Sequence, residues 1–500
     1  MPSLSDLDYE NPVKIASTQI ETVAIIGGGA SGAIILDTLL KEPSNIKKIV
    51  VFERQKKLGG IWLFNKDIRS TPNDLIKSGS YNLENDPQLP NPFHKQQEKA
   101  KKILLPKNTQ ERFIETPSYY GITTNIIEKM MTYSDVNKWD VEGDAETRKY
   151  VEGSIVQDYI EKYFDKNLND PRTELRLNST VEDVERITRD DNSNGSDKIP
   201  YRFKLTVRNP QDDDHDVWYQ EEFDTVVVAT GHYHVPFIPH VPGLKTVQEK
   251  YPSKIQHAKF YRDSSSYKNK TVVVVGSRAS GADLTKFIAR EDGTTVYQSV
   301  RNFDNTKFVT QKTNVVKKPQ IEKFESSKRS IKVFFEDGTL LENPDYVIYC
   351  TGYLFSYPYL NRLTNNQITE GITIPNLYQH TFLINEPLIT IIGVPIDGIS
   401  FRVFEYQAVL LARYLTGKIS LPPRSKQSEW VNKRYEDKKN TRAYHTIGVL
   451  DAFNYSNDLV KLGEVSDKVE VGRKFPILSS DDILLYKEAG EKLKKFWDER

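Results

Sequence analysis

The stretch Thr22-Val-Ala-Ile-Ile-Gly-Gly-Gly-Ala-Ser-Gly32 decides how the chain is organised. Val23 to Ile26 form a short apolar run, which is typical of a strand buried on both faces. Gly27, Gly29 and Gly32 follow at the spacing G-x-G-x-x-G. Glycines at this spacing allow a tight turn, the close approach of a pyrophosphate and close packing of a helix on the strand. The stretch therefore predicts a dinucleotide-binding turn.

The residues after this turn support the prediction. Ala30 to Lys41 has apolar residues at helical period, so Ala30 and Ser31 open a helix whose N-terminus attracts phosphate groups. A second apolar strand, Lys48 to Phe52, ends at Glu53, which lies 53 − 32 = 21 residues beyond Gly32. An acid about 20 residues after the last glycine is typical of a group that binds a ribose hydroxyl. A plain turn between strand and helix is the alternative.

The composition excludes several classes of protein. Lys plus Arg and Asp plus Glu both number 69, so the net charge is zero, which argues against a nucleic-acid partner. Cys350 is the one cysteine, which excludes an internal disulfide, a C-x-x-C dithiol and a cysteine-based zinc cluster, and no metal site is predicted. Met1 to Ser17 lacks an apolar signal core, and no window approaches the about 18 apolar residues of a membrane span. We expect a cytoplasmic protein and leave open peripheral attachment to the endoplasmic reticulum membrane.

Leu58-Gly-Gly-Ile-Trp62 follows the first unit. Gly60 and Trp62 suit the close approach of a flat ligand, although a turn before a core tryptophan is an equal reading. Residues 65–116 are polar and too long for an ordinary connection, so they are interpreted as an insertion over the site or on the surface.

A second unit repeats the opening theme. Thr271 to Val275 reads as a strand, Gly276-Ser-Arg-Ala-Ser-Gly281 as the turn, and the next strand ends at Arg301, 301 − 281 = 20 residues later. An arginine there can pair with a 2′-phosphate, which favours NADP over NAD, with an ordinary surface arginine as the alternative. Arg278 replaces the middle glycine, so its side chain must point away from the pyrophosphate or contact it as a cation.

Four further patterns lie outside the two turns. Two strands end in Thr-Gly, at Thr230-Gly231 and Thr351-Gly352. Asn125 lies in a Thr-Thr-Asn turn, where composition alone favours a helix cap. Tyr251, His257 and Tyr261 are spaced as F-x-G-x-x-x-H-x-x-x-(Y/F), with Tyr for Phe and Ser253 for Gly. We call residues 251–261 the identifier segment.

In their order, these motifs resemble the flavin-containing monooxygenases of the fungal and bacterial kind, which are class B flavoprotein monooxygenases. The resemblance implies an α/β fold with a Rossmann-like FAD domain and an inserted, smaller Rossmann-like NADP domain. The implied boundaries are residues 18–234 (FAD domain, with the insertion 65–116), 235–343 (NADP domain), 344–422 (FAD domain, second part) and 423–500 (a tail packing on the FAD domain).

The resemblance also implies the roles of single residues. Asn125 matches the catalytic asparagine at the flavin, and His257 and Tyr261 match positions that orient NADP. The positions that match the family's cofactor-binding motifs are Gly27, Gly29, Ala30, Ser31, Gly32, Glu53, Gly60, Trp62, Thr230, Gly231, Gly276, Ser277, Arg278, Ser280, Gly281, Arg301, Thr351, Gly352 and Gln407.

The implied cofactors are FAD and NADPH, and the implied partners are dioxygen and a small molecule. In the implied reaction NADPH reduces FAD, and a C4a-hydroperoxyflavin passes one oxygen to a thiol, thioether or amine. A Baeyer–Villiger or N-hydroxylating enzyme is the nearest alternative, although the Baeyer–Villiger identifier ends in Trp where Tyr261 stands. A disulfide reductase is disfavoured because there is no cysteine pair, and Arg278 keeps open a non-catalytic FAD protein. A homodimer is left open.

Replacing Arg301 tests the choice of coenzyme. Arg301→Ala should weaken NADPH binding by roughly 1.5–3 kcal/mol, the value of a hydrogen bond to a charged group. NADH binding should change little, because NADH has no 2′-phosphate. Titration of both coenzymes checks this, and an equal loss for the two would contradict the assignment.

Overall fold

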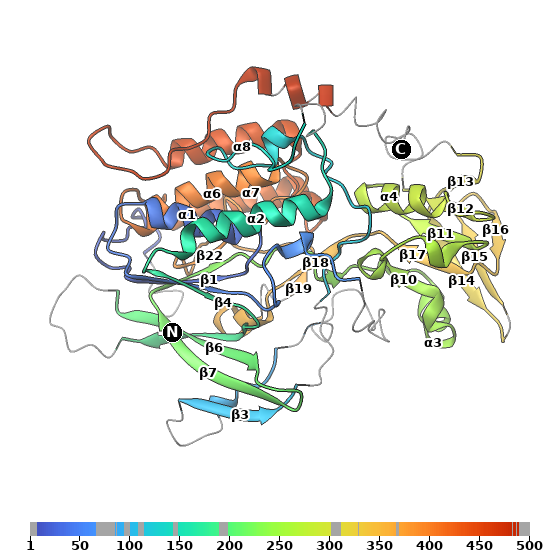
Figure 1. Ribbon diagram of the computed structural model, residues 1–500, viewed down its shortest axis with the longest axis horizontal. Helices are drawn as coiled ribbons and strands as arrows, with labels where there is room; N and C mark the ends of the chain where they lie inside the picture. Colours follow the sequence, from blue (N-terminus) through green and yellow to red (C-terminus); the bar gives the residue numbers. More distant parts are fainter. Residues whose placement is uncertain are drawn as a thin grey trace.

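The computed structural model describes residues 8–66, 86, 88–94, 101–108, 115–143, 149–189, 199–301, 312–328, 330–366, 370–482, 484–486, 488 and 489, to which all structural statements below refer. These residues form a larger and a smaller lobe side by side (Figure 1). Each lobe contains a mainly parallel sheet that includes the strand of one of the two predicted strand–turn–helix units.

The larger lobe is built around the first predicted strand, β1 (Thr22–Ile26). It pairs in parallel with β2 (Lys48–Phe52) and β8 (Thr225–Val228), and such apolar strands without alternation need cover on both faces. The helices α1 (Ala30–Lys41), α2 (Gly153–Leu168) and α6 (Ser400–Leu415) cover one face (Figure 1). The sheet order is β20 (Leu377–Tyr378), β21 (Phe382–Leu383), β22 (Ile389–Ile391), β8, β1, β2 and β4 (Thr173–Arg176).

An antiparallel sheet lies on the other side of the larger lobe. Its order is β3 (Lys102–Pro106), β7 (His215–Phe223), β6 (Tyr201–Pro210) and β5 (Thr180–Thr188). The strand β3 comes from the predicted insertion 65–116, so this part of the insertion extends a sheet. Residues 67–85, 87, 95–100 and 109–114 of the insertion lie outside the described residues.

The smaller lobe carries the second predicted unit. Its parallel sheet has the order β10 (Ile255–His257), β17 (Tyr346–Tyr349), β11 (Thr271–Val275), β12 (Thr295–Ser299) and β13 (Val315–Lys318). The helices are α3 (Leu244–Lys250) and α4 (Ala279–Ile288), and a second, antiparallel sheet consists of β14 (Ile321–Ser326), β15 (Ile331–Phe335) and β16 (Leu340–Glu342).

The predicted boundary between residues 343 and 344 is wrong with respect to the sheets. It places β17 in the larger unit, whereas β17 pairs with β10 and β11 of the smaller lobe. The chain enters the smaller lobe after β9 (Val235–Pro236) and returns through β18 (Tyr353–Ser356), and these two strands pair antiparallel. The smaller lobe is therefore an insertion whose two connecting strands lie side by side. The strand β19 (Glu370–Gly371) pairs with β18 and forms the edge of this small sheet.

The tail packs on the larger lobe through α7 (Arg424–Lys438), α8 (Val449–Leu462) and a buried arginine. The Arg473 guanidinium lies 2.6 Å from carboxylate oxygens of Asp37 in α1, Asp135 and Glu405 in α6. The remaining helical turns are α5 (Asn361–Thr364), η2 (Gly60–Trp62), η4 (Pro92–His94), η5 (Glu128–Met130), η6 (Pro252–Lys254), η7 (Ala258–Phe260), η8 (Ser265–Tyr267), η9 (Pro358–Leu360) and η10 (Arg442–Tyr444).

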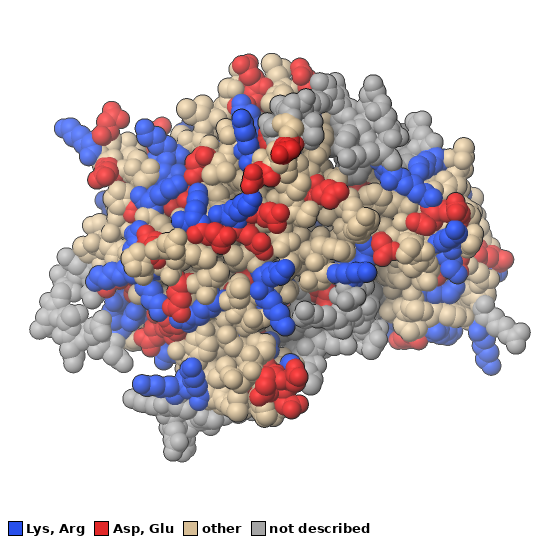
Figure 2. All heavy atoms as spheres, in the orientation of Figure 1, with Lys and Arg blue, Asp and Glu red and all other residues tan. Residues whose placement is uncertain are grey.

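Charge on the face seen in Figure 2 is mixed, with Lys and Arg interspersed among Asp and Glu, as the zero net charge suggests. Among the described residues, no helix has the length and apolar character that crossing a membrane requires.

A pair of buried histidines joins the tail to the larger lobe. His380 Nδ1 and His445 Nδ1 lie 2.9 Å apart, and the Ile374 amide donates to His445 Nε2. His445 therefore donates from Nδ1 to His380. Burial, together with the nearby Arg434 cation, holds the pKa of both imidazoles well below the ordinary value.

This pair should make the protein acid-labile. Above about pH 6.5 neither the folded nor the unfolded state protonates these imidazoles, so their contribution is complete. Below that pH the unfolded state alone binds protons, and each histidine lowers the free energy of unfolding by about 1.4 kcal/mol per pH unit. His380→Asn keeps an acceptor for His445 and should reduce the slope of the free energy of unfolding against pH by about 1.4 kcal/mol per pH unit.

Urea unfolding between about pH 6.5 and 5.5 measures this slope. The matched control is His215→Asn, because the His215 side chain is 44% exposed and lies outside the buried pair, and its slope should equal that of the wild type. Equal slopes for His380→Asn and the wild type would contradict the prediction.

Candidate functional site

The first glycine turn is closed by the end of a neighbouring strand. Gly27 has φ +120°, and a Cβ there would lie 2.4 Å from the Ala229 carbonyl oxygen, which follows β8. A Cβ on Gly32 would lie 2.1 Å from the Gly27 carbonyl oxygen. Ala30 and Ser31 open α1, and the Ser31 hydroxyl donates to Ala229 at 3.2 Å. Side chains are thus excluded where the backbone must stay accessible.

The acid predicted to bind a ribose lies beside this turn. Glu53 follows β2 and is buried, and its two carboxylate oxygens accept from the amides of Gly28 at 2.6 Å and Gln55 at 2.7 Å. Burial raises the pKa of this carboxyl. Gly60 faces the turn, since a Cβ on Gly60 would lie 3.0 Å from the Gly29 Cα, and Trp62 follows in η2.

The second glycine turn repeats this construction. Gly276 has φ +126°, and a Cβ there would lie 2.8 Å from the carbonyl oxygen of Cys350, which follows β17. A Cβ on Gly281 would lie 2.4 Å from the Gly276 carbonyl oxygen. Ala229 and Cys350 therefore occupy matching places in the two lobes, and the backbone at both turns fits a dinucleotide.

The polar residues of the second turn remain accessible. Ser277 and Ser280 are half-buried, and Arg301 is exposed just beyond β12. Arg278 precedes α4, and its guanidinium pairs with Asp397 of the larger lobe. The Arg278 side chain thus joins the smaller lobe to a carboxylate of the larger lobe.

Thr230 and Thr351, which the sequence predicts at two further strand ends, each form a hydrogen bond within the protein. The Thr230 hydroxyl lies 3.1 Å from the Tyr359 hydroxyl, and Gly231 follows it. The Thr351 hydroxyl donates to the Phe237 carbonyl, and Gly352 follows.

Gln407, a predicted cofactor-binding residue, is hydrogen-bonded within the larger lobe. It is buried in α6, where its amide accepts from the Gly393 N–H at 3.1 Å and donates to Thr381 and Tyr455. It would act on a cofactor only through Gly393.

Asn125 is exposed and caps no helix, since the next helical turn, η5, begins at Glu128 after Ile127. The segment around it is anchored to α2, because the Thr124 amide donates to Val151 and the Gly153 amide donates to Ile122. A Cβ on Gly153 would also lie 3.3 Å from the Trp62 ring. Asn125 is thus held close to the Gly60–Trp62 turn.

The identifier segment clamps the chain ahead of Asn125. Lys259 is fully buried, and its Nζ donates to the carbonyls of Glu115 and Tyr233. Arg262 donates to the carbonyls of Thr116 and Ser118 at 3.3 and 3.2 Å. Sequence reasoning missed both residues; the available signal was a positive charge within the identifier segment, at Lys259, and another directly after it, at Arg262.

The side chains of His257 and Tyr261 contact other parts of the protein. His257 Nε2 donates to the Gly352 carbonyl at 2.9 Å, and Nδ1 accepts from the Lys259 amide. Burial lowers the pKa of this imidazole to about 3, so it is neutral and ties the identifier segment to a strand end. The Tyr261 ring packs against Tyr119 at 5.5 Å and Tyr267 at 6.0 Å, away from the surface.

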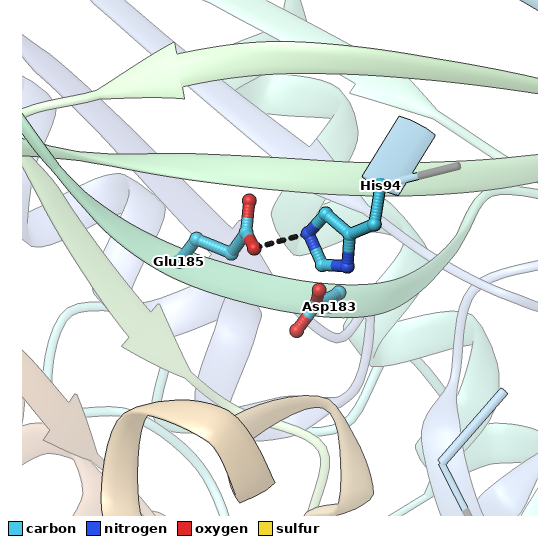
Figure 3. Close-up of side chains that lie close together, drawn as sticks. All are labelled: His94, Asp183 and Glu185. Atoms are coloured by element: carbon cyan, nitrogen blue, oxygen red, sulfur yellow. Dashed lines mark hydrogen bonds and ion pairs between the residues drawn. The ribbon is translucent and has the colours of Figure 1, made fainter. Parts of the chain in front are cut away.

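One group of potential metal ligands occurs among the described residues. His94 of η4 faces Asp183 and Glu185 of β5, with a hydrogen bond to Glu185 (Figure 3). The Arg362 guanidinium lies 3.4 Å from Asp183 and 3.3 Å from Glu185, and Asn91 donates to Asp183. Because an arginine already neutralises these carboxylates, the group is an ion-pair network between the insertion and β5.

Comparison with known proteins identifies the family. The flavin-binding monooxygenase-like family model matches residues 108–305 and 304–483. The chain belongs to this family. Its members are flavoprotein oxidoreductases that bind FAD and use NADPH, so the predicted family, enzyme class and cofactors are confirmed.

The flavin-containing monooxygenase ustF2 of Aspergillus flavus is 27% identical over 89% of this chain and 92% of its own. The flavin-containing monooxygenase FMO GS-OX3 of Arabidopsis thaliana is 28% identical over 88% of this chain and 84% of its own.

Solved structures of flavin-binding monooxygenases share the fold. S-allyl-L-cysteine S-oxygenase from Allium sativum has a TM-score of 0.70 at 23% identity, covering 96% of this chain and 94% of its own. Tmm from Pelagibacter has a TM-score of 0.65 at 22% identity, covering 96% and 90%. The predicted α/β class with two Rossmann-like units is confirmed.

Replacing Lys259 tests the clamp of this flavin-binding monooxygenase. Lys259→Met keeps the length of the side chain but leaves two buried carbonyls without their donor, which should cost about 1–3 kcal/mol of stability. Denaturant unfolding measures it. The control Lys268→Met removes only an exposed pair with Asp292, worth under about 1 kcal/mol. A loss no larger than the control's would contradict the clamp.

Proposed function

We propose that this flavin-binding monooxygenase transfers one oxygen atom from dioxygen to a soft nucleophile, namely a thiol, thioether or amine. The observation that carries the proposal is the pair of matching glycine turns in two lobes, together with the hydrogen bonds that tie Lys259 and Arg262 to the chain ahead of Asn125. The name of the Allium sativum neighbour, an S-oxygenase, makes a thioether the first substrate to test.

The first turn, with Glu53, would hold FAD, and the second turn, with Arg301, would hold NADPH. When bound, these cofactors supply the redox and oxygen-activating chemistry. The chain's own work is to orient them and to keep water from the reacting centre. His257 is fully hydrogen-bonded and neutral, so it positions Gly352 and is not assigned as a base.

A Baeyer–Villiger or N-hydroxylating reaction remains the alternative, because a cyclohexanone monooxygenase shares the fold with a TM-score of 0.51 at 12% identity. A disulfide reductase is disfavoured. The single cysteine, Cys350, has no second cysteine to pair with, and burial raises the pKa of its thiol far above the ordinary value.

Product analysis separates these reactions. The holoenzyme is given NADPH, ¹⁸O₂ and, in separate samples, a thioether, a ketone and a primary amine. We expect a sulfoxide with one labelled oxygen. An ester from the ketone, with no sulfoxide, would overturn the proposal in favour of the alternative.

Asn125 is proposed as the residue that holds the flavin edge or the bound oxygen through its amide. Asn125→Ala should retain FAD but divert NADPH oxidation to hydrogen peroxide. The fraction of NADPH that yields product should fall at least about tenfold, the equivalent of one hydrogen bond of about 1.5 kcal/mol. The control is Asn45→Ala, an exposed asparagine in the larger lobe. Unchanged coupling would refute the role.

A further inference from the structure

Arg442 is an arginine of the tail that reaches Gly352, where the chain returns from the smaller lobe. It opens η10, which is tied to the loop after β22: the Ile396 amide donates to His445, and the Ile447 amide donates to Ile396. The hydrogen bond between His380 and His445 also anchors this turn to the larger lobe. The backbone that carries Arg442 is therefore fixed by the larger lobe.

The guanidinium lies at the strand ends of both lobes. Its Nη1 is 2.7 Å from the place of a Cβ on Gly352, which follows β17 of the smaller lobe. Its charge also acts on His232 and Tyr233, which follow Gly231 and β8 of the larger lobe. The carboxyl ends of parallel strands are where open α/β sheets bind their ligands.

Arg442 lacks a counter-charge among the described residues. Its Nε is buried without a hydrogen-bond partner, and no carboxylate there lies within ion-pair distance. Asp397, in the loop below, is already paired with Arg278. By contrast, the buried Arg473 contacts three carboxylates. A half-buried cation without a partner is costly unless a ligand completes it.

A second polar side chain at the same place is also unpaired. Both ring nitrogens of His232 are buried without a partner of normal hydrogen-bond geometry, although the Gly393 backbone lies near. The imidazole packs between Tyr233 and Phe355. Burial and the Arg442 charge lower the pKa of His232 to about 3, so it adds no charge. The positive charge of Arg442 is thus left for a ligand.

We propose that Arg442 binds an oxyanion of a reactant at the junction of the two lobes, beside Gly352. Two reactants carry such a group: an amino-acid thioether, through its carboxylate, and NADPH, through a phosphate. The carboxylate source rests on the proposed function, and the phosphate source rests only on the confirmed use of NADPH.

The test measures binding without turnover. Flavin difference spectra of the holoenzyme give dissociation constants for NADP⁺, S-methyl-L-cysteine and 2-(methylthio)ethylamine, which lacks only the carboxylate. Arg442→Gln removes the charge and Arg442→Lys keeps it, while Lys433→Gln, an exposed site on α7, is the control. Arg442→Gln should weaken one oxyanion probe roughly ten- to a hundredfold, and Arg442→Lys should weaken it less.

The outcomes separate the two sources. A loss confined to S-methyl-L-cysteine assigns the carboxylate, and a loss confined to NADP⁺ assigns the phosphate. The proposal is overturned if Arg442→Gln leaves the dissociation constants of NADP⁺ and S-methyl-L-cysteine unchanged. It is also overturned if Arg442→Gln weakens the binding of 2-(methylthio)ethylamine as much as that of S-methyl-L-cysteine. Failure of the wild type to form a sulfoxide would refute the proposed function alone, because NADP⁺ binding by Arg442→Gln is measured independently.

Discussion

The structure depends on one close approach made twice, in which a glycine turn packs against the carbonyl that ends a neighbouring parallel strand. Gly27 meets Ala229 in the larger lobe, and Gly276 meets Cys350 in the smaller one. Neither turn tolerates a Cβ, so the backbone at each helix N-terminus stays open to a phosphate. The same strand ends continue into Gly231 and Gly352, so the two turns also fix the position of these segments. The residues that connect the lobes near them, His257, Arg278 and Arg442, come from different parts of the chain.

Local elements were predictable because their signals are local. The helix Ala30–Lys41 and the strands Lys48–Phe52 and Thr271–Val275 occur with the predicted bounds, since an apolar period and adjacent glycines determine them. Pairing was less predictable. The strand β17 was placed in the wrong unit because its partner β11 lies about 70 residues earlier, and nothing within Tyr346–Tyr349 specifies that partner.

Site residues followed the same division. Motif positions such as Gly276 and Glu53 were predictable because each has a fixed spacing to a strand end. Lys259, Arg262 and Arg442 were not, because their partners are backbone carbonyls or strand ends far away in the chain. Gln407 is the opposite case. A motif match assigned it to the cofactor site, and in the structure its amide oxygen accepts a hydrogen bond from the Gly393 N–H. The motif therefore predicted which part of the fold Gln407 occupies, whereas long-range hydrogen bonds determine what its side chain contacts.

The late position of Arg473 affects how the chain can fold during synthesis. Asp37, Asp135 and Glu405 each pair with a cation on α1, α2 or α6 that is made earlier, but their buried ion-pair network is complete only once Arg473 has been translated. The smaller lobe meets no such delay, because its strands β10 to β17 form one continuous stretch. Domains generally fold as units once their segments have emerged. The inserted lobe can therefore mature first, and the lobe that surrounds it closes after translation of the tail.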